Sequence, residues 1–177
     1  MNHFRWHSRI LYRLRIATRS MPSRMSWVWA MVALGGYGVM YMPFGVSVGF
    51  LKFQPEPNPG EWLNVAFGSL LMPGLSEELM FRVLLIPHPT EPMRPLVRQR
   101  WIFGSWVLFI VAHLPPWTPG FFREIPFLLG AGFLGILCTL SYLQSRSMWT
   151  AVFIHWAIVV QWLLVWGGLE MFRWVPT

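Results

Sequence analysis

The chain contains five long runs of mostly apolar residues. Short stretches rich in proline and arginine separate these runs. We expect these runs to be helices that cross a membrane, because a helical span needs about 20 mostly apolar residues. The predicted spans are about 27–51, 62–86, 101–114, 125–143 and 149–169. Pro73 and Gly74 are expected to interrupt the second span near its middle. The third run is short, which favours a tilted helix or one whose ends lie in protein. The pattern predicts an all-α, polytopic transmembrane helix bundle.

The first 25 residues follow a different pattern, in which six arginines alternate with apolar side chains. At about 3.6 residues per turn this spacing predicts an imperfect amphipathic helix that lies on an anionic inner leaflet. We therefore expect a basic cytoplasmic segment over residues 1–25 and a transmembrane helical domain over 26–177. The basic region is too long for a cleavable signal peptide, and a transit peptide is the lower-ranked alternative.

The charge of the chain supports a membrane protein and argues against binding to nucleic acid. The composition is 55% hydrophobic and 12% charged, with a formal net charge of +7. In a soluble protein that charge would suggest a nucleic-acid partner. Here the basic residues lie in the N-terminal segment and in short loops, as the positive-inside rule describes. We expect a multi-pass integral membrane protein, surrounded by lipid, with its N-terminus in the cytoplasm and no nucleic-acid partner.

A few ionisable side chains remain inside the predicted spans, where they are costly and usually functional. They are Glu77, Glu78, Arg82, His113 and His155. Counted at 1.5 Å per residue, Glu77, His113 and His155 lie roughly 12 to 18 Å from the same side of the membrane. Three different helices therefore bring one acid and two imidazoles to one level, and this coincidence predicts a functional site.

The two adjacent glutamates have different expected roles. Glu78 and Arg82 are four residues apart, so they can form an ion pair on one helix face that limits the cost of burying both charges. Glu77 points about 100° away and has no cation on its own face. An unpaired buried glutamate suits a general base, although a protonated carboxyl that is hydrogen-bonded across helices is the structural alternative.

The two histidines leave the question of a metal open. Glu77, His113 and His155 have the ligand types of a zinc site. The HExxH motif is absent, however, and a water held between Glu77 and a histidine could also attack a carbonyl without a metal. Cys138 is expected to be a small buried residue outside any metal-ligand cluster. His88, between two prolines of a predicted loop, is expected to be solvated.

Three motifs resemble those of the CPBP family of CAAX proteases and bacteriocin-processing enzymes, also called Abi. Residues 77–82, EELMFR, resemble the family's EExxxR motif, and residues 109–113, FIVAH, resemble its FxxxH motif. His155, in the helix that follows the turn QSRSMW, resembles the third motif. The resemblance covers roughly residues 62–168, and the motifs occur in the family's order.

This resemblance implies an intramembrane endopeptidase that acts on membrane-associated proteins or peptides. It implies that Glu77 is the base and that His113 positions or polarises the attacking water. Glu78 and Arg82 would orient the site, while His155 would bind a metal or stabilise the oxyanion.

One position departs from the family's pattern. The third motif usually has asparagine or aspartate one turn after the histidine, and the chain has Val159 there. This departure favours the alternative function, a non-catalytic membrane scaffold or bacteriocin-immunity-type binding protein that keeps the family core. A proton-coupled transporter ranks third, because a short chain without an internal repeat argues against it.

Overall fold

The computed structural model describes residues 3–173, with side chains from residue 8 onward. Every regular element in this range is helical, which confirms the all-α prediction. The α-helices are α1 (His3–Arg19), α2 (Arg24–Ser47), α3 (Pro59–Ser69), α4 (Ser76–Glu78), α5 (Pro95–Val111), α6 (Ile125–Ser145), α7 (Met148–Val165) and α8 (Gly168–Arg173). The π-helical segments η1 (Leu70–Leu75) and η2 (Leu79–Leu84) adjoin α4, and the 3₁₀ segment η3 (Gly120–Arg123) precedes α6. Residues 1–2 and 174–177 of the two predicted domains lie outside the described residues.

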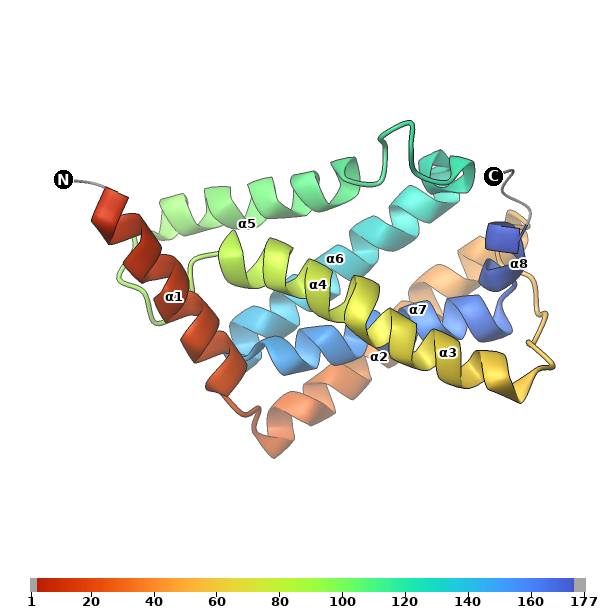
Figure 1. Ribbon diagram of the computed structural model, residues 1–177, viewed down its shortest axis with the longest axis horizontal. Coiled ribbons are helices and arrows are strands. Elements are labelled where there is room, and N and C mark those ends of the chain that lie inside the picture. The colour runs from red at the N-terminus through yellow and green to blue at the C-terminus, as the bar shows by residue number, and fades with distance from the viewer. Residues whose placement is uncertain (1–2, 174–177) are drawn as a thin grey trace.

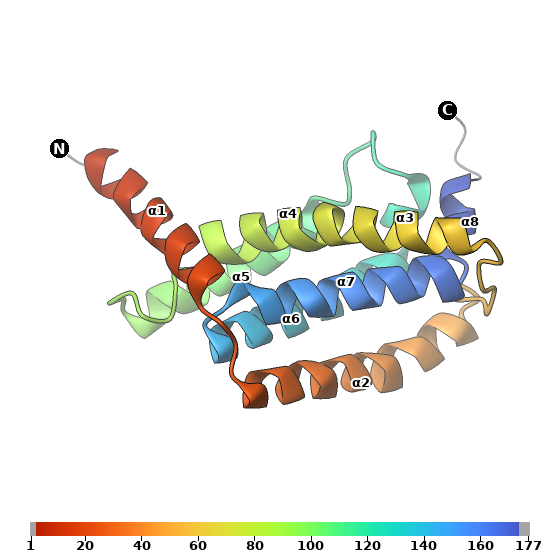
Figure 2. The same ribbon diagram turned by 60° about the horizontal axis from the view of Figure 1, so that its bottom comes forward.

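Three helices of the described chain, α2, α6 and α7, are long and apolar enough to cross a membrane. α3, η1, α4 and η2 follow one another without a gap and form one long rod across the molecule (Figure 1). α5 lies against both the rod and α6, and α2 lies on the far side of α7 from the rod (Figure 2). Three spans therefore have direct support, while the rod and the 17-residue α5 remain predicted spans.

The rod is broken at Met72, where the backbone is extended (φ −142°, ψ 115°). Pro73 causes this break, because proline has no N–H for a helical hydrogen bond and its ring clashes with the preceding turn. The helix resumes at α4 and then widens into the π-helical η2. The sequence prediction of an interruption at Pro73 and Gly74 is confirmed. The resumed half of the rod carries the whole EELMFR motif.

α6 and α7 run side by side through the middle of the bundle, joined by a two-residue turn (Figure 2). Arg146 ends α6 in the left-handed conformation (φ 57°, ψ 22°), and the Ser147 hydroxyl accepts a hydrogen bond from the backbone N–H of Trp149. The serine caps α7 by satisfying an N–H that has no partner within the helix. This short turn fixes the depth of His155, seven residues into α7, relative to α6.

Glycines on α6 let its neighbours approach closely. A Cβ at Gly130 would lie only 2.6 Å from the ring of Tyr41 on α2. A Cβ at Gly135 would lie 3.1 Å from Phe109 on α5 and 3.4 Å from Arg82 on the rod. Small residues at helix interfaces in membranes allow the helix backbones to approach closely. They let α2, α5 and the rod pack closely against α6.

The predicted N-terminal helix is present as α1, which lies obliquely across one end of the bundle (Figure 1). Arg13 donates to both carboxylate oxygens of Glu91, at 2.7 and 3.0 Å, and to the carbonyl of Leu84 at 2.8 Å. The indole N–H of Trp149 donates to the carbonyl of Thr18 at 2.9 Å. These contacts attach α1 to the protein. Its location on a lipid surface stays a prediction.

The loop before α5 corrects the expectation for His88, which is 2% exposed instead of solvated. Its Nε2 lies 3.1 Å from the carbonyl oxygen of Arg146, and its Nδ1 lies 2.7 Å from the hydroxyl of Thr90. Burial lowers the pKa of His88, because the charged imidazolium loses its hydration. The prediction was wrong because the loop folds back against the α6–α7 turn, a contact between residues 58 positions apart.

Two element boundaries also differ from the prediction. α5 begins at Pro95, whereas the sequence placed residues 95–100 in a loop. Proline is well suited to the first helical turn, since its fixed φ is helical and its missing N–H would be unpaired there. α7 ends at Val165, whereas the predicted span reached residue 169, because Gly167 turns the chain with φ +79°.

Candidate active site

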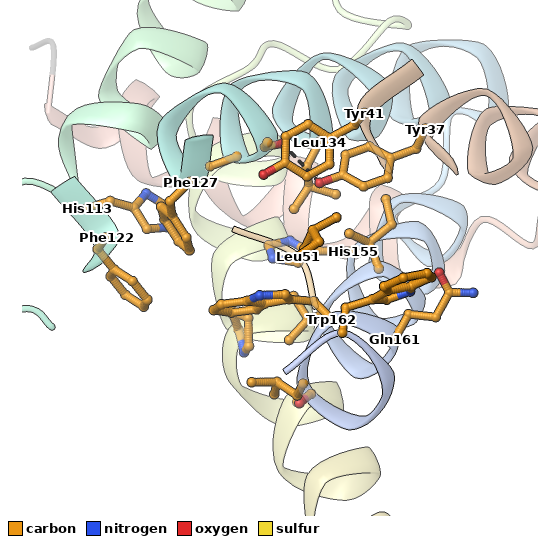
Figure 3. A pocket seen from close by; sticks show the side chains of 18 of the residues that line it. Tyr37, Tyr41, Leu51, His113, Phe122, Phe127, Leu134, His155, Gln161 and Trp162 are labelled. Carbon is orange, nitrogen blue, oxygen red and sulfur yellow. Dashed lines mark hydrogen bonds between the residues drawn. The ribbon is translucent and has the colours of Figure 1, made fainter. Parts of the chain in front are cut away.

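A cavity of about 470 Å³ lies in the middle of the bundle (Figure 3). Its walls are mostly apolar and aromatic and come mainly from α2, the rod, α6, α7 and the segment after α5. Glu77, His113 and His155 all line it. The structure thus brings the three residues that the sequence placed at one depth to the same cavity. Glu78 and Arg82 lie behind this wall, fully buried.

Glu78 connects Arg82 with His155. Its Oε1 lies 3.2 Å from Nη1 of Arg82, so the predicted ion pair is present, and 2.7 Å from Nδ1 of His155. Since a carboxylate only accepts hydrogen bonds, Nδ1 of His155 is the donor. A carboxylate bonded in this way fixes both the tautomer and the orientation of an imidazole. The other ring nitrogen, Nε2, is left as an acceptor in neutral His155.

Arg82 is held by contacts on three sides. Its Nη2 donates to the carbonyl of Gly135 at 3.0 Å, and its guanidinium carbon lies 4.5 Å from the centroid of the Phe109 ring. The cation–π contact and the hydrogen bond together reduce the cost of burying the charge. Ser105 of α5 donates to the carbonyl of Phe81 on η2, which ties α5 to the same turn.

Glu77, like Glu78, has a buried carboxylate oxygen without a hydrogen-bond partner, and Glu77 lines the cavity. This oxygen, Oε2 of Glu77, lies 3.8 Å from Nε2 of His155. Both atoms are acceptors when Glu77 is ionised and His155 is neutral, and two acceptors this close need a proton, a water or a cation between them. Buried polar atoms without partners are rare in proteins. The pair is therefore suited to hold and deprotonate a water molecule.

His113 lies two residues beyond the end of α5, at the opposite side of the cavity from α7 (Figure 3). Its Nδ1 lies 2.9 Å from the carbonyl oxygen of Phe109, so Nδ1 donates and Nε2 is an acceptor in neutral His113. The rings of Phe109, Phe122 and Phe127 surround the imidazole, with centroids 5.2 to 5.5 Å away. These rings fix the orientation of His113.

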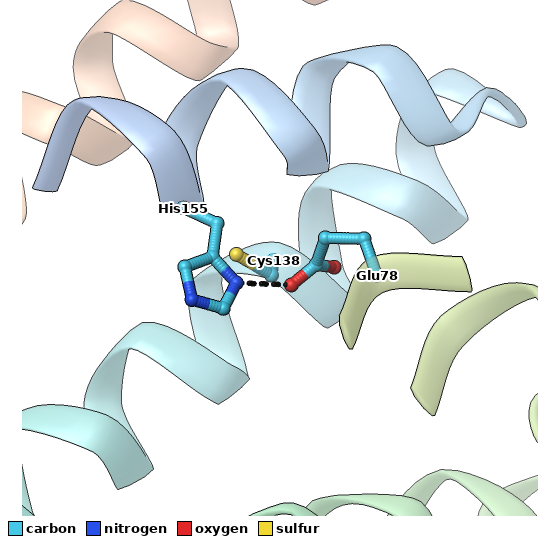
Figure 4. Close-up of side chains that lie close together, drawn as sticks. All are labelled: Glu78, Cys138 and His155. Carbon is cyan, nitrogen blue, oxygen red and sulfur yellow. Dashed lines mark hydrogen bonds and ion pairs between the residues drawn. The ribbon is translucent and has the colours of Figure 1, made fainter. Parts of the chain in front are cut away.

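The ligand types lining the cavity suit a divalent cation. Glu77, His113 and His155 would offer one carboxylate and two imidazole nitrogens, the chemistry that zinc prefers. Within residues 3–173, however, the three side chains whose ligand atoms lie within 4.8 Å of one another are Glu78, Cys138 and His155 (Figure 4). The predicted set shares the cavity without forming so close a group, and it stays a prediction.

Cys138 is the residue that the sequence analysis missed. It is fully buried, as expected, but the expectation that it lies outside any metal-ligand cluster was wrong. α6 passes behind both Glu78 and His155, so its small side chains meet them (Figure 4). One signal was present in the sequence: Cys138 is one turn after Gly135, on the helix face through which α6 approaches its neighbours.

Comparison with known proteins adds one match. The family model described as type II CAAX prenyl endopeptidase Rce1-like matches residues 59–160, more than half of the chain. The matched range overlaps most of the predicted core, 62–168, and includes all five predicted site residues. No curated protein and no solved structure matches the chain.

Proposed function

The chain belongs to the Rce1-like family of type II CAAX prenyl endopeptidases, and we propose that it hydrolyses peptide bonds of membrane-associated proteins or peptides. Membership supports a CAAX-type intramembrane protease, and helices that can span a membrane support an integral membrane protein. The observation that carries the proposed chemistry is Oε2 of Glu77, an unpartnered buried acceptor 3.8 Å from Nε2 of His155 at the cavity wall.

In the proposed reaction, Glu77 and His155 hold one water molecule through its two hydrogens. When the water oxygen bonds to the peptide carbonyl carbon, Glu77 accepts the proton that the water loses. The carbonyl oxygen becomes an oxyanion. As this intermediate collapses, the C–N bond breaks and Glu77 passes its proton to the leaving nitrogen. One water is consumed, and Glu77 returns to its starting ionisation state.

The neighbouring groups have supporting roles in this proposal. Glu78 keeps Nδ1 of His155 protonated and thereby keeps Nε2 free for the water, while Arg82 keeps Glu78 ionised. His113 faces the same cavity and would position the water or polarise the carbonyl. A divalent cation held by Glu77, His113 and His155 would supply Lewis-acid polarisation of the carbonyl, and the ligand types present fit such an ion.

The cavity supports an apolar substrate segment, since aromatic rings form much of its wall. Those rings are Tyr37, Tyr41, Phe50, Phe109, Phe122, Phe127, Trp162, Trp166 and Phe172. Transfer of the apolar side chains of a membrane-anchored peptide into this cavity costs little free energy, because these side chains are poorly hydrated before they enter. We propose that the scissile peptide enters this cavity from the lipid. A prenylated and an unprenylated version of one reporter would measure whether a prenyl group adds to recognition.

We also propose that the end of the bundle that carries α1 faces the cytoplasm. Exposed arginines gather there on α1 and around the start of α5, and Glu91 is the acid among them that the structure pairs with Arg13. The opposite end has Glu56, bonded to Arg173. The positive-inside rule supports this orientation for a chain with about five spans, a basic segment over 1–25 and a helical domain from 26 onward.

The test is cleavage of a membrane-anchored reporter by the purified full-length protein in lipid vesicles. Glu77→Ala and His113→Ala are each expected to abolish cleavage while the protein still inserts and unfolds cooperatively. Glu61→Gln, on α3 outside the cavity, is the matched control and should cleave as wild type does. Full activity in both alanine variants would refute the site assignment. A cellular phenotype that survives Glu77→Gln would favour the scaffold alternative.

A further inference from the structure

Glu78, Cys138 and His155 form a second cluster of ligand-type atoms, which shares His155 with the groups that face the cavity. The three side chains come from α4, α6 and α7, and their ligand atoms lie within 4.8 Å of one another. They are 0%, 0% and 2% exposed. Figure 4 shows Sγ of Cys138 beside the gap between the Glu78 carboxylate and the imidazole. The site is therefore closed to bulk solvent and is preformed by three separate helices.

Two of these groups have spare bonding capacity. Sγ of Cys138 lies 3.5 Å from the carbonyl oxygen of Ala151 and within hydrogen-bonding reach of the Glu78 carboxylate, and within the described residues no shorter hydrogen bond holds it. Oε2 of Glu78 is buried and has no hydrogen-bond partner. A buried carboxylate oxygen without a partner loses its hydration and gains nothing in return. These two atoms together suit a ligand that binds both sulfur and oxygen.

The charge around the cluster supports a cation. With both carboxylates ionised, Glu77, Glu78 and Arg82 leave one net negative charge in an apolar bundle, where an uncompensated charge is expensive. A divalent cation that binds Cys138 as the thiolate brings the group to neutrality. Arg82, 3.2 Å from Oε1 of Glu78, remains as a counter-charge on the side away from the cavity.

We propose that Glu78, Cys138 and His155 bind a thiophilic divalent cation such as Cd²⁺ or Zn²⁺, and that this cation inhibits the enzyme. Cation–sulfur and cation–nitrogen bonds of about 2.3 and 2.0 Å place tetrahedral ligands roughly 3.5 Å apart, so closure needs shifts of about 1 Å. Oε2 of Glu78 or a water would fill the fourth position. Binding itself is independent of the proposed function, whereas the inhibition rests on it.

The inhibition follows from the proton balance. Cys138 loses its thiol proton to solvent, and the proton on Nδ1 of His155 is replaced by the cation and moves to Nε2. One proton is released for each cation bound. Nε2 then faces Glu77 as a donor, so the two residues can bond to each other and no longer offer two acceptors to a water. The site that holds the cation thus disables the site that faces the cavity.

The test is a titration of the purified full-length protein in detergent with CdCl₂. Wild type is expected to gain the ultraviolet cadmium–thiolate charge-transfer band, with one Cd²⁺ bound and one proton released. Cys138→Ala should show no band, and its inhibition constant for Cd²⁺, measured against its own cation-free rate, should rise at least tenfold. Cys138→Ser, which replaces the sulfur with the smaller oxygen and leaves less empty space than alanine, should also lack the band and covers the case in which the alanine variant does not fold.

The outcomes separate the two proposals. A wild-type protein without the band, or Cys138 variants that Cd²⁺ inhibits as strongly as wild type, would overturn the cation site. The band needs no catalysis, so it can appear in a wild-type protein that cleaves no reporter. That combination would retain the cation site and reject the proposed protease chemistry.

Discussion

Two polar clusters in this bundle differ in how fully their carboxylates are hydrogen-bonded. Beneath α1, both oxygens of Glu91 are bonded, Oε1 to Arg13 and the backbone N–H of His88, and Oε2 to Arg13. In the middle of the bundle, Oε2 of Glu77 and Oε2 of Glu78 have no partner. The satisfied carboxylate joins helices, and its removal is expected to affect stability alone. The two carboxylates with an unpaired oxygen lie at or beside the cavity, where that oxygen is available to bind a ligand or a water.

The largest expected effect is on catalysis by Glu77→Gln. Loss of a general base costs about 10² to 10⁴ in rate. The free energy of unfolding should stay the same or rise, because the change removes a buried charge that has no partner. Cleavage rate and thermal unfolding, measured on the same vesicle sample, check both parts. A large loss of stability would show that Glu77 is a structural residue.

Glu78→Ala should instead lower stability together with activity. Removing one partner from a buried ion pair costs about 3 to 5 kcal/mol, since the remaining charge, here Arg82, is left uncompensated. His155 also loses the acceptor that fixes its tautomer. Denaturant unfolding in detergent measures the change, and Glu78→Gln is the control that keeps shape and one acceptor. Wild-type stability in the alanine variant would contradict the linking role of Glu78.

Arg13→Ala tests the cluster beneath α1 and should lower the free energy of unfolding by roughly 1.5 to 3 kcal/mol. This range is typical of hydrogen bonds to charged groups. Cleavage per folded molecule should not change, because the cluster is separate from the cavity. Arg9→Ala, an exposed arginine on the same helix, is the matched control and should have little effect on stability. A selective loss of cleavage in Arg13→Ala would link α1 to the active site.

The smallest expected effect is a pH dependence from His88. Burial lowers its pKa in the folded protein, so below the usual value of about 6.5 the unfolded chain binds more protons than the folded one. The stability contribution is present above pH 6.5 and is lost as the pH falls further, by less than about 1.4 kcal/mol per pH unit. His88→Gln should flatten thermal unfolding profiles between pH 5 and 7. An unchanged slope would assign the pH dependence to other groups.

The helices and the Glu78–Arg82 ion pair could be predicted from the sequence, whereas contacts between distant segments could not. The break at Pro73 and the Glu78–Arg82 pair depend on neighbours within one or two turns, and both were predicted correctly. The burial of His88 depends on a contact with Arg146, 58 residues away, and the sequence analysis did not predict it. From the sequence, Glu77, His113 and His155 were expected to lie near one another only because they have similar depths in the membrane. Counting residues along each helix gives these depths approximately, and it does not show how the separate helices pack.

By itself, the sequence determined that the chain is helical, which residues are ionisable at membrane depth, and that it carries the motifs of a protease family. Only the tertiary structure decided that Glu78 sets the tautomer of His155, that Oε2 of Glu77 has no hydrogen-bond partner, and that Cys138 joins the cluster. The physical reason is that helix formation depends on hydrogen bonds four residues apart, whereas these contacts depend on how α6 and α7 pack against the rod. That packing is set by glycines, turns and side-chain volumes from the whole chain.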